Sequence, residues 1–485
     1  MEMTPLSRDW TVDAPAKGRI EIVENLLMMA VPMVMLGFLL LRPSTNSDMF
    51  WQLKLGELTL ANGAPLSSEP FAVTHLGEPV QNLAWAGQAF MAFVLEWTGW
   101  RGLRLFDALC WAGGFWVVGA ACIMRGRQAL AVAIGLGLAF IAALPTAILR
   151  PQSMASLCFG LLLVLLGCKL ESKYKVVAGT VLLLVWQNLH PSVSLAFGVL
   201  GIHAAVGLWQ WWLDRSRALP LAELTLIPIS IVAMFCTPDG ISILRTSAYN
   251  GEISLLVGVG EWMPLWAPLN HGVALPIVAV AVLGLLVMRK FPGLFDLREA
   301  LTCLALFAMT VLVYRFVLFW AISLVAVVAS CRMRTQPLKE KGRSLLFAGL
   351  GVLAVAAACT AFKPVEFRSH IPLQALQVLK RENLTGTVFS DFTLGGGVIH
   401  VGYPQWRVAY DGRFYRYSRE EWQRFAGIQS GKVQLAELER RYHPVAWVLH
   451  PRRNARLASE LDSANGRWRR LWRDDHVVIY APPRR

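Results

Sequence analysis

The chain has 485 residues, of which 55% are hydrophobic and only 16% are charged, and its formal net charge is +14. A soluble protein usually carries about a quarter charged residues, so this composition excludes an ordinary soluble globular protein. Residues 1–22 and 364–485 are rich in charge, whereas the stretch between them alternates apolar runs with short polar breaks. This pattern is typical of a helical membrane domain with soluble parts at its ends.

The apolar runs predict eleven membrane-spanning helices in chain order. The first run is long enough to remain as a span, and the mixed charges before it do not resemble a cleaved signal. Some runs are shorter than the ~20 residues that a span needs, so two adjacent pairs could be helical hairpins. The spans are expected at residues 24–42, 102–123, 128–146, 151–169, 175–190, 192–213, 222–237, 272–289, 297–313, 314–331 and 344–362.

The charges between the spans predict the orientation of the chain. With the N-terminus in the cytoplasm, every cytoplasmic loop is basic, as the positive-inside rule requires. The outer loops then include residues 43–101 and 237–271, and the odd number of spans places residues 364–485 outside the cytoplasm as well. Within the first outer loop, Asn82 to Trp97 is apolar and aromatic, and we expect an amphipathic helix in the membrane interface there. The basic loops are Arg125–Arg127, Lys169–Lys175, Asp214–Arg217, Arg289–Arg298 and Arg332–Arg343.

The chain therefore divides into a cytoplasmic segment (1–23), a transmembrane part (24–363) and a soluble α/β domain (364–485). All eight cysteines lie in or at the ends of apolar runs, so neither a disulfide framework nor a cysteine-rich zinc site is expected. In the soluble domain, hydrophobic periodicity predicts helices that alternate with short strands. The helices are expected at 372–383, 417–429 and 452–463, and the strands at 386–390, 406–410, 446–450 and 477–480.

The soluble domain is basic, with 20 Lys/Arg against 12 Asp/Glu. This surface is typical of solvated charge or of a patch that rests on anionic headgroups, and capture of an acidic glycan is an alternative. Nucleic acid is not an expected partner, because the topology places the domain outside the cytoplasm. Gly395, Gly396 and Gly397 follow the first predicted strand and could form a strand-to-helix turn that binds an anion, or a turn without a ligand.

Ionisable groups near membrane depth are costly and mark a candidate functional site. In the predicted topology these groups gather at the outer face, whereas a scatter without function would have divided them between both faces. Asp48 can face both a lipid-borne substrate and water, with Phe50 and Trp51 as an apolar rim. The gathered residues are Asp48, Arg150, Asn188, His190, Glu261, Trp262 and Arg315.

Structural roles remain open for most of these residues. Arg150 and Arg315 could anchor helix ends by snorkelling. His190 precedes a proline and could be a helix-end residue, and Glu261 could be structural. Trp262 could belong to the belt of aromatic residues at the membrane–water boundary.

Several stretches, in the right order along the chain, resemble the motifs of bacterial GT-C-type glycosyltransferase-like membrane proteins. The segment from Asn46 to Glu57 resembles their D-x-x-W-H-L-x-x-G-E motif, and the segment from Ala64 to Thr74 resembles I-P-x-x-D-P-F-S-x-T. Further matches are R-P-Q at Arg150–Gln152, W-x-N-x-H at Trp186–His190, E-W at Glu261–Trp262, and the G-G-Y and D-G-R elements near Gly395–Gly397 and Asp411–Arg413.

The resemblance implies an all-α polytopic membrane bundle of about 11 transmembrane helices, GT-C-like, with a C-terminal extracytoplasmic α/β domain. It also implies an enzyme that moves a sugar from a polyprenyl-phosphate carrier to an envelope glycan, lipid or protein, at the outer face of the bacterial inner membrane. Asp48 would be the base that activates the acceptor, and Glu69 a second carboxylate or its orienter. Arg150, Arg315 and His190 would neutralise the departing phosphate. The other expected substrate-binding residues are Trp51, Gln52, Asn188, Glu261, Trp262, Asp411 and Arg413, although Asp411 and Arg413 could instead form a structural ion pair.

The sequence departs from these motifs at Gln52, where the motif commonly has His, and at Glu69, where it has Asp. Gln52 removes a titratable or metal-binding group, so metal dependence stays open, and Asp48 with Glu69 could bind Mg²⁺ or Mn²⁺. Two rival functions remain. A non-catalytic component of exopolysaccharide assembly or export would not need Asp48 and Glu69. A transporter would need polar groups in both halves of the membrane, which the one-sided distribution disfavours.

Overall fold

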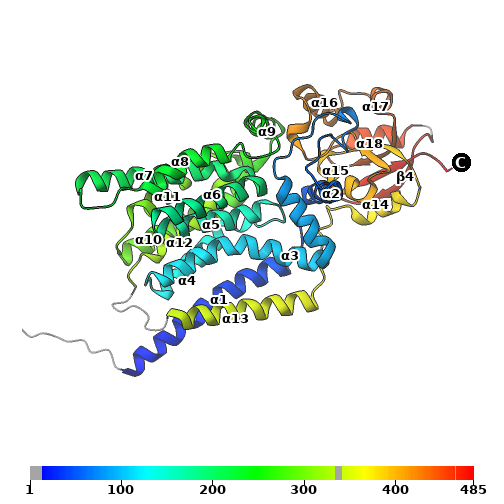
Figure 1. Cartoon of the computed structure of the whole chain (residues 1–485). Helices are drawn as coiled ribbons and strands as arrows, with labels where there is room; N and C mark the ends of the chain where they lie inside the picture. Colours follow the sequence, from blue (N-terminus) through cyan, green and yellow to red (C-terminus); the bar gives the residue numbers. More distant parts are fainter. Residues whose placement is uncertain (1–13, 334–340, 465, 485) are drawn as a thin grey trace, which may run out of the picture.

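The structure, a computed structural model, describes residues 14–333, 341–464 and 466–484. Most of the predicted cytoplasmic segment 1–23 and of the basic loop Arg332–Arg343 therefore lies outside the described residues. Helices dominate the first three quarters of the chain, and the last quarter contains a small mixed sheet with helices packed around it (Figure 1).

Every one of the eleven predicted spans coincides with a helix. Four of the described helices, α3, α4, α7 and α10, are long and apolar enough to cross a membrane by length and composition alone, counted with adjoining 3-10 turns. The chain is thus a multi-pass membrane protein by its apolar helices, whereas the number of eleven spans stays a prediction. The helices are α1 (Ala14–Leu41), α3 (Trp85–Met124), α4 (Ala129–Ala143), α5 (Gln152–Gly167), α6 (Ser172–Leu189), α7 (Ser194–Leu213), α8 (Leu221–Ala233), α10 (His271–Lys290), α11 (Leu297–Leu312), α12 (Val317–Ala329) and α13 (Lys341–Phe362).

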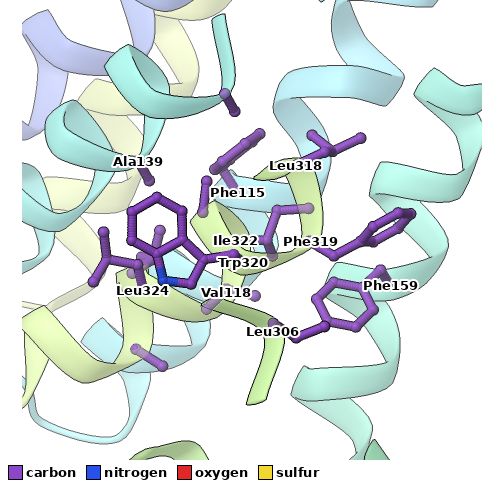
Figure 2. Packing of buried hydrophobic residues seen from close by; sticks show 14 of the residues in the cluster. Phe115, Val118, Ala139, Phe159, Leu306, Leu318, Phe319, Trp320, Ile322 and Leu324 are labelled. Atoms are coloured by element: carbon purple, nitrogen blue, oxygen red, sulfur yellow. The ribbon is translucent and has the colours of Figure 1, made fainter. Parts of the chain in front are cut away.

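The core of the bundle forms around α12, whose every residue is buried. Figure 2 shows Trp320 and Phe319 of this helix among the side chains of α3, α4, α5 and α11. Small residues let α3 and α5 cross closely, because a Cβ added at Gly160 would lie 2.3 Å from the carbonyl oxygen of Gly114. Such small-residue crossings are typical of membrane helices, which gain no hydrophobic free energy by leaving lipid. At the edge of the bundle, α1 and α13 run side by side (Figure 1).

Two helices outside the predicted spans position the site. α2 (Asp48–Asn62) follows α1 directly and is buried along most of its length, and α9 (Ser242–Val257) lies in the second predicted outer loop. The expected helix at Asn82–Trp97 is present as the first half of α3, which bends at Gly99 (φ +65°) before the apolar second half. Seven 3-10 turns complete the described helical elements: η1 (Val73–His75), η2 (Leu144–Thr146), η3 (Pro191–Val193), η4 (Gly260–Trp262), η5 (Pro268–Asn270), η6 (Tyr314–Phe316) and η7 (Phe414–Arg416).

The C-terminal part contains a five-stranded sheet in the order β2-β1-β3-β5-β4. Strands β2, β1 and β3 are parallel to one another, and β5 pairs antiparallel with both β3 and β4. The three predicted helices and four predicted strands are present, while α15, α17 and β4 were not predicted. At the β2 edge, the amide of Val408 donates to the carbonyl of Phe71, 3.0 Å away, from the first outer loop. The elements are α14 (Leu373–Lys380), β1 (Gly386–Ser390), α15 (Phe392–Gly402), β2 (Trp406–Val408), α16 (Arg419–Gln429), α17 (Leu435–Tyr442), β3 (Pro444–Leu449), α18 (Ala455–Asp462), β4 (Arg469–Arg473) and β5 (Val478–Ala481).

The glycine run does not form the expected turn, because all three glycines lie inside α15. The missing side chain of Gly396 lets α15 pack on the start of α2, where an added Cβ would lie 2.6 Å from the carbonyl oxygen of Ser47. The N-terminus of α15 already has a carboxylate, since Asp391 accepts the amide of Thr393 (3.1 Å) and pairs with Arg453 (2.9 Å). The glycines therefore serve helix packing, and an anion at this turn is not proposed.

Candidate functional site

Four charged residues from four separate segments form an alternating chain of ion pairs. Arg150, just before α5, donates to Asp48 Oδ2 at the start of α2 over 2.8 Å. The same guanidinium lies 3.4 Å from Glu261 on η4, and Glu261 in turn lies 3.3 Å from Arg315 on η6. The residues that the sequence placed at one face of the membrane thus meet in one network.

Asp48 is held in place by its neighbours in sequence and by the loop that precedes α5. Asn46 accepts the amide of Asp48 (3.0 Å) and a hydrogen bond from Arg150 (3.3 Å), and it donates to the carbonyl of Leu149 (3.1 Å). Trp51 donates its indole N–H to the other carboxylate oxygen of Asp48, 3.4 Å away. Asn46 was not among the expected site residues, although it lies only two positions before Asp48.

The C-terminal part reaches this carboxylate through Gly412. A Cβ added at Gly412 would lie 2.2 Å from Asp48 Oδ1, so no larger residue fits there without displacing Asp48. The glycine of the D-G-R motif therefore makes room for the candidate catalytic group. Sequence alone did not reveal this, because the two residues are more than 360 positions apart.

The ion-pair network lines a cavity of about 130 Å³. Arg315 stacks over the Trp262 ring with its Cζ 4.6 Å from the ring centroid. His190 Nδ1 accepts the backbone amide of Ser192 (3.2 Å), so the neutral imidazole carries its proton on Nε2. The polar or aromatic lining residues are Asp48, Trp51, Gln52, Gln88, Arg150, Gln152, His190, Asn250, Ser254, Glu261, Trp262, Arg315, Phe414 and Tyr415.

The two carboxylates of the cavity differ electrostatically. Burial raises the pKa of Asp48 above its ordinary value, although Arg150 opposes the shift. Burial also acts against ionisation of Glu261, but Arg150 and Arg315 together hold its pKa below the ordinary value. A raised pKa makes Asp48 the stronger base of the two, while Glu261 stays an ionised partner of the two arginines.

Glu69, Asp411 and Arg413 form a second network, which is closed to solvent. Arg413 donates to both oxygens of Glu69 (2.6 and 2.8 Å) and to both oxygens of Asp411 (2.9 and 2.7 Å). The side chains of Glu69 and Asp411 are 0% exposed, and that of Arg413 is 1% exposed. Glu69 also accepts the amides of Phe71 and Ala72. Although burial opposes it, the Arg413 guanidinium holds the pKa of Glu69 below its ordinary value.

A third network lies nearby and joins the same two parts of the chain. His75 bonds Glu78 through Nδ1 and Glu421 through Nε2, both over 2.9 Å. Arg416 pairs with Glu78 and donates to the carbonyl of Pro79. The first outer loop is therefore fastened to the C-terminal part by two sets of ion pairs.

The structure thus separates the expected site residues into two groups. Asp48, Trp51, Gln52, Arg150, His190, Glu261, Trp262 and Arg315 line one cavity. Glu69, Asp411 and Arg413 do not line it, and Asn188 bonds Trp85 and the carbonyls of Leu184 and Cys236 instead. Asn250 and Ser254 were missed, although their spacing of four on α9 places them on one helix face.

The expected metal ligands do not come together. Glu69 is saturated by Arg413 and two backbone amides, so Asp48 and Glu69 do not form a site for Mg²⁺ or Mn²⁺. Among the described residues, no three His, Cys, Asp or Glu side chains are grouped so that they could hold a metal ion.

Known proteins resemble this chain in fold rather than in sequence. No protein-family model matches, and no curated protein sequence matches. Among solved structures, ArnT from Cupriavidus metallidurans bound to undecaprenyl phosphate has a TM-score of 0.54 at 14% identity, over 96% of this chain and 98% of that chain. The apo state of the same protein has a TM-score of 0.53 at 14% identity with the same coverage. The chain therefore has a GT-C-like fold over nearly its whole length, as its motifs predict.

Proposed function

We propose that this protein is a membrane glycosyltransferase that moves a sugar from a polyprenyl-phosphate carrier to an envelope glycan, lipid or protein acceptor. The observation that carries the proposal is the cavity in which Asp48, Arg150, Glu261 and Arg315 alternate in charge. The fold agrees with this assignment, since one of the structures that the chain resembles, ArnT, holds undecaprenyl phosphate. The proposed site of reaction is the outer face of the bacterial inner membrane, with the C-terminal part outside the cytoplasm.

The chemistry divides between the carboxylate and the arginines. Sugar transfer needs a base that takes the proton of the acceptor hydroxyl, and cations that stabilise the phosphate as it departs. Asp48 is the proposed base. Its side chain is 24% exposed, and its raised pKa favours proton acceptance. Arg150 and Arg315 are the proposed phosphate ligands, because a guanidinium can contact a phosphate with two parallel hydrogen bonds.

A donor phosphate would rearrange the ion pairs. The two carboxylates and two arginines balance in formal charge, so an incoming phosphate competes with Asp48 and Glu261 for the same guanidinium groups. Partial release of Arg150 from Asp48 would leave the carboxylate free to act as a base. Donor binding would in this way prepare the base for its role.

The proposed test compares sugar transfer by wild-type and Asp48→Asn protein in membranes, with radiolabelled polyprenyl-phosphate sugars as donors. Asp48→Asn keeps the size of the side chain but removes the base, and we expect transfer to fall by about 10²- to 10⁴-fold. Asp475→Asn, which changes an exposed carboxylate of the C-terminal part, is the matched control and should leave transfer unchanged. Expression and thermal stability of both variants are measured in parallel.

The alternative is a non-catalytic component of exopolysaccharide assembly or export. It predicts that wild-type and Asp48→Asn copies rescue the envelope of a deletion strain equally well. Equal rescue, with equal amounts of inserted protein, would remove the base role of Asp48 and favour this alternative.

A further inference from the structure

A second polar cavity, of about 280 Å³, lies within the bundle away from the Asp48 cavity. Helix α5 begins with Gln152, which lines the Asp48 cavity, and ends with Gly167, which lines the second cavity. At a rise of 1.5 Å per residue, these two ends of the helix are about 22 Å apart. Helix α6 likewise has Lys175 at the second cavity and His190 beyond its other end. We call this second cavity the inner cavity, because three of the loops predicted to be cytoplasmic contribute residues to it.

The inner cavity carries an excess of positive charge. Its lining contains four cations, Arg125, Arg127, Lys175 and Arg298, against two carboxylates, an excess of two with His203 neutral. These cations come from three of the predicted loops, which the fold brings together although they are far apart in sequence.

The two carboxylates are already engaged. Glu299 lies 3.1 Å from Arg125 and 3.5 Å from Arg127, and Asp296 accepts the amide of Arg298 at the start of α11. Lys175 donates to the carbonyl of Leu166 (3.3 Å), and Arg298 to the side-chain carbonyl of Gln210 (3.4 Å). Neither of these two cations has a carboxylate partner among residues 14–333, 341–464 and 466–484.

The cavity also contains buried polar atoms without partners. His203 is 5% exposed and Thr302 is 1% exposed, and both line the cavity. Within the described part of the chain, the two ring nitrogens of His203 form no hydrogen bond. The hydroxyl of Thr302 forms none with these residues either. Buried polar groups in native proteins nearly always have partners, so these atoms indicate that something polar binds beside them.

We propose that the inner cavity is a binding site for a phosphate group, either as dissolved phosphate or as the phosphate headgroup of a membrane lipid. Lys175 and Arg298 would supply the charge that no carboxylate neutralises, and His203 and Thr302 would each supply a hydrogen-bond donor. The excess of two positive charges matches a phosphomonoester dianion. Basic pockets between membrane helices on the cytoplasmic side bind anionic headgroups in other proteins.

The size of the cavity is compatible with such a group. A single water molecule needs about 10–15 Å³ of cavity volume measured in the same way, so 280 Å³ leaves room for a tetrahedral anion with its remaining waters. The site does not depend on the glycosyltransferase proposal, because none of its lining residues belongs to the Asp48 cavity.

The test uses the full-length protein in phosphatidylcholine nanodiscs and measures binding of radiolabelled inorganic phosphate by equilibrium dialysis at fixed ionic strength. All variants also carry Arg150→Gln, so that phosphate in the outer cavity does not contribute. We expect the pair Lys175→Gln and Arg298→Gln to weaken binding about tenfold or more. The matched control is the pair Lys173→Gln and Arg217→Gln, which removes two exposed cations of neighbouring loops and should leave affinity unchanged.

A second variant keeps the charges intact. Thr302→Val preserves the shape of the side chain and removes only its hydroxyl, and we expect it to weaken phosphate binding by several-fold to about tenfold. Addition of phosphatidic acid to the nanodiscs separates the two sources of phosphate. Displacement of the labelled phosphate identifies a lipid headgroup as ligand, and retention identifies dissolved phosphate.

The proposal is wrong if the protein with intact inner-cavity residues binds neither phosphate nor phosphatidic acid. It is also wrong if the control pair loses as much affinity as the Lys175 and Arg298 pair.

Discussion

The contact between Gly412 and Asp48 shows how one missing side chain positions another. Asp48 Oδ1 occupies the volume in which a Cβ of residue 412 would lie, at 2.2 Å. The position of the candidate base therefore depends on a residue of the C-terminal part that makes no hydrogen bond to it. Position 412 requires glycine because of the space that Asp48 occupies, and not because of any chemical group that residue 412 supplies.

Gly412→Ala is expected to reduce sugar transfer strongly while the protein still folds. Displacement of a reacting group by about 1 Å can cost ~10²-fold in rate, and we expect a loss of that order. The control is Gly198→Ala in α7, where an added Cβ meets no heavy atom of the described residues within 4 Å. Equal transfer by the two variants would show that Asp48 does not need this space.

Glu69→Gln is expected to act on stability rather than on chemistry. It leaves Arg413 with one fewer charged partner in a site closed to solvent, and breaking a buried ion pair costs about 3–5 kcal/mol. The measurement is thermal unfolding in detergent, compared with Arg452→Gln at an exposed position, where a change within about 0.5 kcal/mol is expected. If Glu69→Gln loses sugar transfer without losing stability, Glu69 takes part in catalysis rather than only in folding.

At the scale of elements, the short turn η1 is fastened to α16 by a pair that titrates. The hydrogen bond to Glu421 raises the pKa of His75 despite its partial burial. Burial opposes ionisation of Glu421, but the bond to His75 and the backbone of Ser418 lower its pKa to about 2. The pair is fully charged in the folded protein at mildly acid pH.

The contribution of this pair to stability should depend on pH in a defined way. The raised pKa of His75 contributes stability that is complete below about pH 6.5 and is lost as pH rises through the folded value. The lowered pKa of Glu421 contributes stability above about pH 4.3 that is lost as pH falls toward about 2. Thermal unfolding of wild type and His75→Gln should therefore differ most between about pH 4.3 and 6.5 and converge at alkaline pH. A difference that grows above pH 8 would contradict this assignment.

The sequence predicted elements where a single physical requirement dominates. A helix in lipid must be apolar over a long run, and all eleven predicted runs coincide with helices. It did not predict α2 and α9, which are mixed in polarity. Helix α2 is buried along most of its length, whereas α9 buries only Ile243, Ile253 and Ser254. It also misread α15, because three glycines favour a turn locally while tertiary packing on Ser47 favours a glycine-rich helix.

The candidate site was predictable in part for a similar reason. Asp48, Arg150, Glu261 and Arg315 stand out as charges beside apolar runs, and topology alone brings them to one face. The role of Glu69 was not predictable, because its partner Arg413 is 344 residues away and nothing local distinguishes a buried carboxylate from an accessible one.

At the scale of the whole molecule, the C-terminal part shares its hydrophobic core with the first outer loop. Trp51, Leu55 and Phe71 pack in one buried cluster with residues of α14, α15 and the sheet, such as Leu376 and Val388. The change in sequence composition at residue 364 is therefore not a boundary of packing.

The segment 364–485 expressed alone is expected to aggregate, because the face covered by Trp51, Leu55 and Phe71 would be exposed. The control is a fusion of residues 43–84 to the same segment through a flexible linker, which restores these contacts and should raise the soluble fraction. Gel filtration and thermal unfolding give the readout. A monomeric isolated segment with a cooperative transition would show that the shared core is dispensable.

The hydrogen bond from Val408 to Phe71 has a consequence for association between molecules. Strand β2 is an edge of the sheet, and an open edge offers unpaired backbone groups to the strand of another chain. The first outer loop occupies that edge, while the opposite edge strand, β4, carries the charged side chains of Arg469, Arg470 and Arg473, which disfavour pairing with another strand. We therefore expect that neighbouring copies of this protein, crowded in the plane of a membrane, do not join their sheets edge to edge.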